Sequence, residues 1–281
     1  MPLITVNSIE LCYEERGNGL VMLWAHGLGQ TMKDWDELMS HFEDRYRVIA
    51  YDARGHGRSQ ILETEDDYSQ DLMIEDMLAL LDALEVDKVI VGGHSMGANV
   101  ALNFAMRHPE RCHAVIPVAI GTGSTEPAKW KEYWGKLARL AGEEGIEAYV
   151  DGLRETPSWE RALSHPVIGE RVTQSESANS PRAIANIIRG IQRKRPSIYE
   201  LEDKLKALIV PTLVIFSEGD TPVADCSKYL TKCIPAAKLV EIPASSHWTQ
   251  LEMPDVFHKV IEEFISNLGS SAESVGENII F

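Results

Sequence analysis

Short apolar runs alternate along most of this chain with segments that have the spacing of amphipathic helices. Two β-rich runs at residues 4–6 and 9–15, separated by Asn7-Ser8, predict an antiparallel hairpin. Further runs lie at residues 20–25, 46–51, 88–93, 114–120, 211–217 and 238–243. Strands that are apolar on both faces and separated by helices pair in parallel, because helices then cover both faces of their sheet. The alternation therefore predicts an α/β fold with a doubly wound, mostly parallel sheet.

A long helical stretch interrupts this alternation between residues 121 and 205. It contains no β-rich run and holds half of the six tryptophans. Because β-rich runs resume after it, we interpret the stretch as a helical insertion between two strands of one sheet. Apolar spacing of 3.6 residues predicts helices elsewhere, at residues 68–84, 96–107 and 254–268. The predicted organisation is a core in two parts, residues 1–120 and 206–268, a helical cap at 121–205 and a flexible tail at 269–281.

Charge and composition narrow the classes of partner. Asp and Glu outnumber Lys and Arg by 43 to 27, which gives a formal net charge of −16. A surface this negative repels nucleic-acid phosphates and anionic lipid, so we expect neither as a partner. The chain has no uninterrupted apolar stretch of about 18 residues and no basic N-terminal start, so we expect neither a membrane span nor a signal peptide. The four cysteines have no zinc-binding spacing and are expected to be free thiols in the cytoplasm.

The strongest chemical signal is the segment Gly93-His94-Ser95-Met96-Gly97, which follows an apolar run and opens a helix. This is the context of a nucleophile elbow, in which a serine lies in a strained strand-to-helix turn and glycines avoid clashes. The first amides of the helix point at negative charge that develops near the serine. The segment therefore predicts Ser95 as a catalytic nucleophile. The alternative is a glycine-rich turn whose serine only caps the helix.

A serine hydroxyl needs a base that removes its proton, and a third group that orients the base. Among nine histidines, His247 follows the last β-rich run, which places it at the same carboxyl edge of the sheet as Ser95. The loop after the preceding run supplies Asp220, and the order Ser, Asp, His is the chain order that an elbow in such a sheet predicts. We expect His247 to be the general base and Asp220 its partner, with Glu218 and Asp225 as the alternative acids. His94 is too close to Ser95 along the chain to face its hydroxyl, and the remaining histidines are interpreted as surface, structural or scaffold residues.

A tetrahedral intermediate needs two backbone donors for its oxyanion. The amide of Met96, one residue past the nucleophile, is the expected first donor. The segment His26-Gly27-Leu28-Gly29 directly follows the run at residues 20–25, and its glycines let the backbone approach a ligand. We therefore expect the amide of Leu28 to be the second donor. The alternative is an ordinary strand-to-helix turn.

Taken together, these motifs resemble the α/β-hydrolase family over about residues 3–268. Residues 26–29 resemble its oxyanion loop, residues 93–97 its elbow, and residues 52–59 its D-x-R-G-x-G-x-S signature, which is structural. The segment 247–257 is similar to the family's H-x4-E-x-P-x2-F ending. The resemblance implies that the insertion is a cap over the active site. Within the branch that uses a serine nucleophile, the chain looks most like enol-lactonases, small esterases and cofactor-free haloperoxidase-type hydrolases.

The residues and the resemblance together predict a serine hydrolase that cleaves a carboxylic ester or lactone through an acyl-enzyme, without a cofactor or a metal. A small-molecule substrate is the expected partner, and the protein is expected to be a monomer or a homodimer. Two alternatives stay open. One is a C–C bond hydrolase with the same triad, and the other is a hydrolase-fold receptor for a small lactone.

The insertion also bears on the substrate. Tryptophans in it and beside the base suggest a pocket for an apolar or aromatic group, although such residues also form the core of a cap: Trp130, Trp134, Trp159 and Trp248. A basic cluster could pair with a substrate carboxylate, although a solvated cationic helix end is the simpler interpretation: Arg189, Arg193, Lys194 and Arg195.

Overall fold

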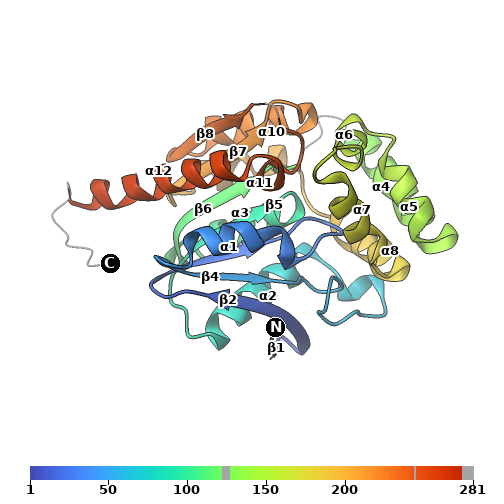
Figure 1. The fold of residues 1–281 in the computed structure, drawn as a ribbon, viewed down its shortest axis with the longest axis horizontal. Coiled ribbons are helices and arrows are strands. Elements are labelled where there is room, and N and C mark those ends of the chain that lie inside the picture. The colour runs from blue at the N-terminus through green and yellow to red at the C-terminus, as the bar shows by residue number, and fades with distance from the viewer. Residues whose placement is uncertain (122–126, 244, 274–281) are drawn as a thin grey trace.

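Eight strands form one sheet at the centre of the molecule, in the order β1-β2-β4-β3-β5-β6-β7-β8 (Figure 1). The computed structural model describes residues 1–121, 127–243 and 245–273. β1 pairs antiparallel with β2, as does β2 with β4, and every other pair is parallel. The predicted hairpin and the α/β fold class are therefore confirmed. The strands are β1 Leu3–Val6, β2 Ile9–Arg16, β3 Leu20–Ala25, β4 Tyr46–Tyr51, β5 Val89–His94, β6 Cys112–Val118, β7 Thr212–Ser217 and β8 Ala237–Ile242.

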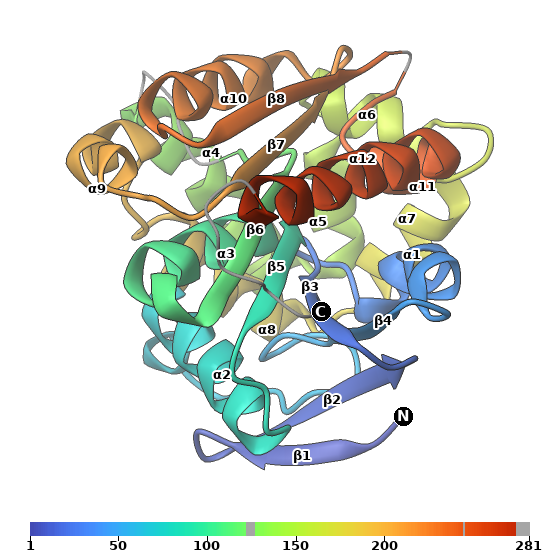
Figure 2. The same cartoon turned by 90° about the vertical axis from the view of Figure 1, so that its left-hand side faces the viewer.

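Helices cover both faces of this sheet. α1 and α12 lie on one face, and α2, α3 and α10 lie on the other (Figure 2). In β3, Met22 and Trp24 pack into the core beneath α1 and α12, whereas Leu23 and Ala25 pack into the core on the opposite side. A strand whose side chains are buried on both faces of the sheet needs a layer of helices on each face. These helices are α1 Asp36–Phe42, α2 Gln70–Ala83, α3 Met96–Arg107, α10 Thr221–Cys233, α11 Thr249–Glu252 and α12 Pro254–Glu273.

Between β6 and β7 the chain leaves the sheet and becomes helical, as predicted. Residues 127–200 are called the cap below, and their helices α4 to α8 gather at one end of the molecule (Figure 1). The helices of the insertion are α4 Pro127–Arg139, α5 Ile146–Leu153, α6 Pro157–Leu163, α7 Gly169–Ser177, α8 Pro181–Ile187 and α9 Glu202–Lys206. Residues 122–126 of the predicted insertion lie outside the described residues. The division into domains stays a prediction.

The ends of the core helices follow their local sequence. α3 spans the predicted residues 96–107. α2 begins at Gln70 because the Ser69 hydroxyl accepts the amide of Leu72 (3.1 Å) and caps the first turn. α12 continues to Glu273, past the predicted end at residue 268, and residues 274–281 of the predicted tail lie outside the described residues. No disulfide joins the four cysteines, as predicted, and all four side chains are buried.

The motif at residues 52–59 fastens the loop after β4. Asp52 accepts the amides of Met32 (2.8 Å) and Arg58 (2.9 Å) through its two carboxylate oxygens. Arg54 donates to both carboxylate oxygens of Asp76 on α2, at 2.6 Å each, and both side chains are buried. A bidentate pair of this kind fixes both distance and orientation. The contacts of the motif join β4, α2 and the loop before α1, which fits the structural role that the resemblance implies.

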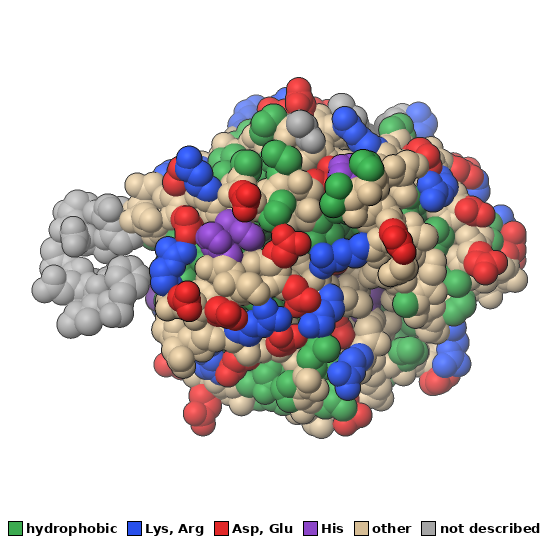
Figure 3. Space-filling view, viewed as in Figure 1, with side chains coloured by type: hydrophobic (Ala, Val, Ile, Leu, Met, Phe, Trp, Pro, Cys, Tyr) green, Lys and Arg blue, Asp and Glu red, His purple; other side chains and the backbone are tan. Residues whose placement is uncertain are grey.

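Charged side chains of both signs are spread over the face of the molecule in Figure 3. On that face Lys and Arg are interspersed with Asp and Glu, whereas a nucleic-acid footprint gathers basic side chains into a patch. Among the helices of the described ranges, none has the length and apolar character needed to cross a lipid bilayer.

The buried pair of Arg54 and Asp76 provides a test of this scaffold. Asp76→Asn leaves the Arg54 guanidinium buried without a counter-charge, so we expect the free energy of unfolding to fall by about 3–5 kcal/mol. Chemical denaturation followed by tryptophan fluorescence measures the change. The matched control is Glu202→Gln, which breaks the exposed pair with Lys206 and should leave stability almost unchanged. An equally small effect of Asp76→Asn would contradict the structural role of residues 52–59.

Candidate active site

Ser95 lies between the end of β5 and the first residue of α3, in a left-handed conformation with φ 50° and ψ −106°. This conformation is strained for a residue with a side chain, and the flanking glycines make it possible. A Cβ on Gly93 would lie 2.4 Å from the carbonyl oxygen of Gly97, and a Cβ on Gly97 would lie 2.2 Å from that of Ala25. The strand-to-helix context predicted for the nucleophile elbow is therefore present.

Asp220 and His247 follow the last two strands and form a buried hydrogen bond. His247 Nδ1–H donates to Asp220 Oδ2, and Asp220 is 1% exposed. This tautomer leaves His247 Nε2 as the nitrogen that can accept a proton. The alternative acids Glu218 and Asp225 are exposed, so Asp220 is the carboxylate that the structure brings to the imidazole.

One cavity of about 290 Å³ brings the predicted residues together. Ser95, His247, Asp220 and Leu28 line it from the core, at the carboxyl ends of separate strands. This is the edge of a parallel sheet at which α/β proteins bind their ligands. The opposite wall comes from the cap and is rich in aromatic side chains: Trp130, Tyr133, Trp134 and Trp159. In residues 1–121, 127–243 and 245–273, no cluster of three or more His, Cys, Asp or Glu side chains could hold a metal ion.

Three of the four tryptophans predicted to contact substrate lie in this cavity wall. Trp130 and Trp134 project from α4, and Trp159 projects from α6. Trp248 is 1% exposed, and its ring packs at 4.7 Å from that of Trp159 and 5.0 Å from that of His247, between ring centroids. Trp248 therefore packs against two residues of the cavity wall but is not among the described residues that line the cavity.

His94 holds the loop that carries His247. Its Nε2 lies 2.9 Å from the carbonyl oxygen of His247, so Nε2 carries the hydrogen and donates. Burial lowers the pKa of His94 well below its usual value and keeps the ring neutral. Sequence reasoning identified the elbow but gave this histidine no role, because its partner lies 153 residues away along the chain.

Glu252 fixes the residue before the imidazole. Its carboxylate accepts the amide of Ser246 (2.7 Å) and also the Ser246 hydroxyl. Glu252 belongs to the H-x4-E ending of the sequence, and this contact gives that spacing a physical reason. The carboxylate anchors the backbone immediately before His247, which limits the rotation of the loop.

Two buried histidines shape the loop at residues 26–30. His26 Nδ1–H donates to the carbonyl of Gly27 (2.7 Å) and its Nε2 accepts the amide of Ala53 (2.9 Å). His56 Nε2 accepts the amide of Gly29 (3.2 Å). Burial lowers the pKa of His26 to about 4 and that of His56 to about 3, so both are neutral acceptors near neutral pH.

These contacts leave specific amides available. In the described part of the chain, the amides of Gly29 and Ser95 have acceptors, but those of Leu28 and Met96 have none. A Cβ on Gly27 would lie 3.5 Å from Ser95 Cβ, so the loop runs directly beside the elbow. These are the two amides that the sequence predicts as oxyanion donors.

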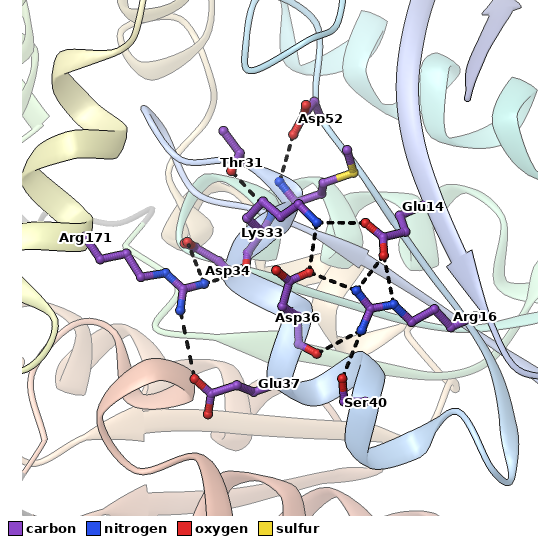
Figure 4. Close-up of polar contacts among 11 residues, drawn as sticks. Glu14, Arg16, Thr31, Lys33, Asp34, Asp36, Glu37, Ser40, Asp52 and Arg171 are labelled. Atoms are coloured by element: carbon purple, nitrogen blue, oxygen red, sulfur yellow. Dashed lines mark hydrogen bonds and ion pairs between the residues drawn. The ribbon is translucent and has the colours of Figure 1, made fainter. Parts of the chain in front are cut away.

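The cap is fastened to this loop by α7 and the residues after it. Asn179 Nδ2 donates to the carbonyl of Gly29 (2.7 Å). The fully buried Glu176 accepts from Gln30 Nε2 (2.6 Å). Figure 4 shows a second contact, in which Arg171 of α7 reaches the carbonyl of Lys33 and lies 3.9 Å from a carboxylate oxygen of Asp34. The cap therefore contacts the loop on which an oxyanion hole would depend.

The chain is similar to known proteins over most of its length. The family model of the alpha/beta hydrolase fold matches residues 21–254. A putative carbamate hydrolase RutD of Caulobacter sp. (strain K31) is 29% identical, over 85% of this chain and 88% of that protein. The 3-oxoadipate enol-lactonase 2 of Acinetobacter baylyi is 26% identical, over 92% of this chain and 94% of that protein. A solved thermophilic esterase from Thermogutta terrifontis is similar with a TM-score of 0.82 at 27% identity, over 95% of this chain and 98% of that one.

Because the family model spans most of the sequence, the chain belongs to the alpha/beta hydrolase fold family. The family and the names of these relatives support a hydrolase as the class of enzyme. The names refer to a carbamate, an enol-lactone and an ester, so membership in the family does not single out one substrate.

Buried acids at the contact between cap and loop give stability a distinct pH dependence. Burial raises the pKa of Glu176 to about 8 and that of Asp34 to about 7, both above the values of unfolded carboxyls. The folded state therefore binds more protons between about pH 5 and pH 8, so stability falls as the pH rises through this window. Glu176→Gln imitates the protonated acid. In this variant the free energy of unfolding should fall between about pH 5 and pH 8 by at least about 1 kcal/mol less than in the wild type.

Denaturant titrations of both proteins at a series of pH values measure this effect. The matched control is Glu170→Gln, an exposed acid on the same helix, which should keep the wild-type slope. If the stability of Glu176→Gln depends on pH as steeply as that of the wild type, Glu176 is ionised in the folded protein.

Proposed function

We propose that this protein is a cofactor-independent serine hydrolase that cleaves a carboxylic ester or a lactone. One observation carries the proposal: the hydrogen-bonded pair of His247 and Asp220 lines the same cavity as Ser95, although the three residues follow different strands. A nucleophile, a base and an orienting acid that converge in one cavity match the requirements of acyl transfer.

In the first step, Ser95 Oγ attacks the carbonyl carbon of the substrate while His247 Nε2 accepts the hydroxyl proton. Asp220 then stabilises the imidazolium ion through the hydrogen bond at Nδ1. The amides of Leu28 and Met96 hold the oxyanion, and each such donor contributes about 3 kcal/mol to lowering the barrier. Collapse of the intermediate breaks the bond to the alcohol oxygen, which receives the proton from His247.

The second step reverses these roles with water as the nucleophile. His247 Nε2 accepts a proton from water, whose oxygen attacks the acyl carbon on Ser95. The same amides hold the second oxyanion. When this intermediate collapses, the bond to Ser95 Oγ breaks, the serine oxygen takes the proton back from His247, and the carboxylic acid leaves.

The cap is proposed to determine which esters enter. Trp130, Trp134 and Trp159 line the cavity opposite the nucleophile and would hold an apolar or aromatic group. A C–C bond hydrolase and a lactone receptor would use the same three polar residues. Turnover rather than the arrangement of the triad therefore separates these alternatives from an esterase or lactonase.

Covalent labelling tests the nucleophile. A fluorophosphonate probe should label the wild type at a single residue and leave Ser95→Ala unlabelled, because only an activated serine attacks the probe. The control Ser40→Ala removes an exposed serine and should be labelled like the wild type. Equal labelling of Ser95→Ala would overturn the proposal.

A substrate panel run beside this labelling tests the reaction. It contains chromogenic esters of graded acyl length, lactones, a carbamate and a vinylogous diketone. We expect turnover of esters or lactones that Ser95→Ala abolishes. Turnover of the diketone alone would favour the C–C hydrolase, and one labelling event without turnover of any substrate would favour the receptor.

Ser158, on cap helix α6, is proposed to position the acid. Its hydroxyl donates to Asp220 Oδ1 (2.9 Å), opposite the oxygen that holds His247. Ser158→Ala should lower kcat about tenfold with little change in KM, because a hydrogen bond to a charged group contributes about 1.5–3 kcal/mol. The pH profile of kcat should change as well, and Ser158→Thr should restore both. A rise in KM alone would assign Ser158 to substrate binding instead.

A further inference from the structure

One cationic side chain in the cavity wall has no anionic partner among the described residues. Arg195 follows the π-helical segment Ile188–Gln192 of the cap and lines the same cavity as Ser95. Its Nη2 donates to the carbonyl of Gly121 (3.3 Å). Its Nε and Nη1 are buried and have no hydrogen-bond partner within the described ranges, and no carboxylate there forms an ion pair with it.

An uncompensated buried charge is unfavourable because the protein interior does not replace the water that the ion has lost. Burial lowers the pKa of Arg195 to about 9, which still leaves the guanidinium protonated near neutral pH. The Gly121 carbonyl satisfies one N–H group out of the five that a guanidinium carries. The folded protein thus keeps a positive charge in the wall that its own described residues do not neutralise.

The other members of the basic cluster differ from Arg195 in this respect. Lys194 pairs with Glu65 at 2.7 Å, and Arg193 is exposed. Within the described residues, neither of them nor Arg189 lines the cavity. A solvated helix end explains those cations, but it does not explain a guanidinium whose Nε and Nη1 are shielded from water.

The surroundings of Arg195 favour an anion over a cation. Trp134 also lines the cavity, and its buried Nε1–H donor has no partner among the described residues. Two acids line the cavity as well, but Asp220 is engaged by His247 and Ser158, and Asp225 is exposed to water on α10. Neither acid forms an ion pair with the guanidinium among the contacts of the described residues.

We infer that Arg195 binds a carboxylate carried by the substrate, at the end of the molecule remote from the carbonyl that Ser95 attacks. The inference rests on the proposed hydrolase function and adds a substrate class to it, namely esters or lactones that carry one free carboxylate. A carboxylate fits because its two oxygens match the planar fork of a guanidinium. The tryptophan wall would hold the apolar chain between the two ends.

Matched pairs of chromogenic esters test this inference. The mono-4-nitrophenyl esters of glutaric, adipic and pimelic acids are compared with 4-nitrophenyl esters of fatty acids of the same chain length. For at least one chain length we expect kcat/KM to favour the carboxylate substrate by tenfold or more, which is about 1.4 kcal/mol. Arg195→Met should remove this preference by raising KM for the carboxylate ester, with kcat nearly unchanged, because the contact is equal in ground and transition states.

Control variants separate binding from folding. Arg195→Met should lower kcat/KM for the carboxylate esters at least tenfold more than for the neutral esters, and Arg195→Lys should keep part of the preference because it keeps the charge. Arg193→Met removes an exposed cation two residues away and should leave kcat/KM unchanged for both classes of ester. Equal losses on both classes in Arg195→Met, or no carboxylate preference in the wild type, would overturn the inference.

A binding measurement keeps this result distinct from failure of the proposed function. The free dicarboxylates glutarate, adipate and pimelate should raise the melting temperature of the wild type and of Ser95→Ala, but not that of Arg195→Met. If no ester is hydrolysed and this stabilisation is still seen, the proposed reaction is wrong while the carboxylate site stands. If neutral esters are hydrolysed through Ser95 and no dicarboxylate stabilises any variant, the reaction stands and the carboxylate site is wrong.

Discussion

The hydrogen bond between His247 and Asp220 is the interaction on which the geometry of the cavity depends. It joins Asp220, which follows β7, to His247, which follows β8. The amides of Glu218 and Gly219 also donate to the carbonyls of Ile242 and Ser245 (3.2 Å each), and Glu252 holds the backbone of Ser246 just before the imidazole. Because Asp220 is buried, its carboxylate oxygens are bound by the Ser158 hydroxyl and the His247 imidazole rather than by water. Any movement of either loop would change the position of the imidazole relative to the elbow.

Local patterns in the sequence predicted the strands, α3 and the elbow, because each of these depends on neighbouring residues. They favoured Asp220 but left Glu218 and Asp225 open as alternative acids, since all three follow the same strand closely. The fold makes the distinction by burying one of them against the imidazole. The contact between Ser158 and Asp220 joins residues 62 positions apart and requires the cap to be seated, so no local pattern could predict it. Trp248 was predicted on the cavity wall because it adjoins the base, but the sequence does not specify which way a loop side chain points.

The histidines of the site show how burial decides between chemistry and scaffold. His26, His56 and His94 are fully buried and use one ring nitrogen as a donor to a carbonyl. Burial keeps them neutral, so they act as rigid connectors between loops. His247 instead places one nitrogen against a carboxylate and lines the cavity, which allows it to carry a positive charge for part of a reaction. One residue type therefore supplies both the frame of the site and its proposed base.

The cap brings two kinds of buried ionisable group to the site, and burial affects them in opposite ways. Glu176 loses its charge by binding a proton, because its pKa is raised to about 8, and so it joins the cap to the core as a neutral hydrogen-bonding group. Arg195 stays protonated near neutral pH. Its positive charge would be compensated when the proposed anion binds. With a net charge of −16, the protein as a whole repels anions at long range. A cation in a wall of low dielectric constant offsets that repulsion at contact distance, where Coulomb interactions are strongest.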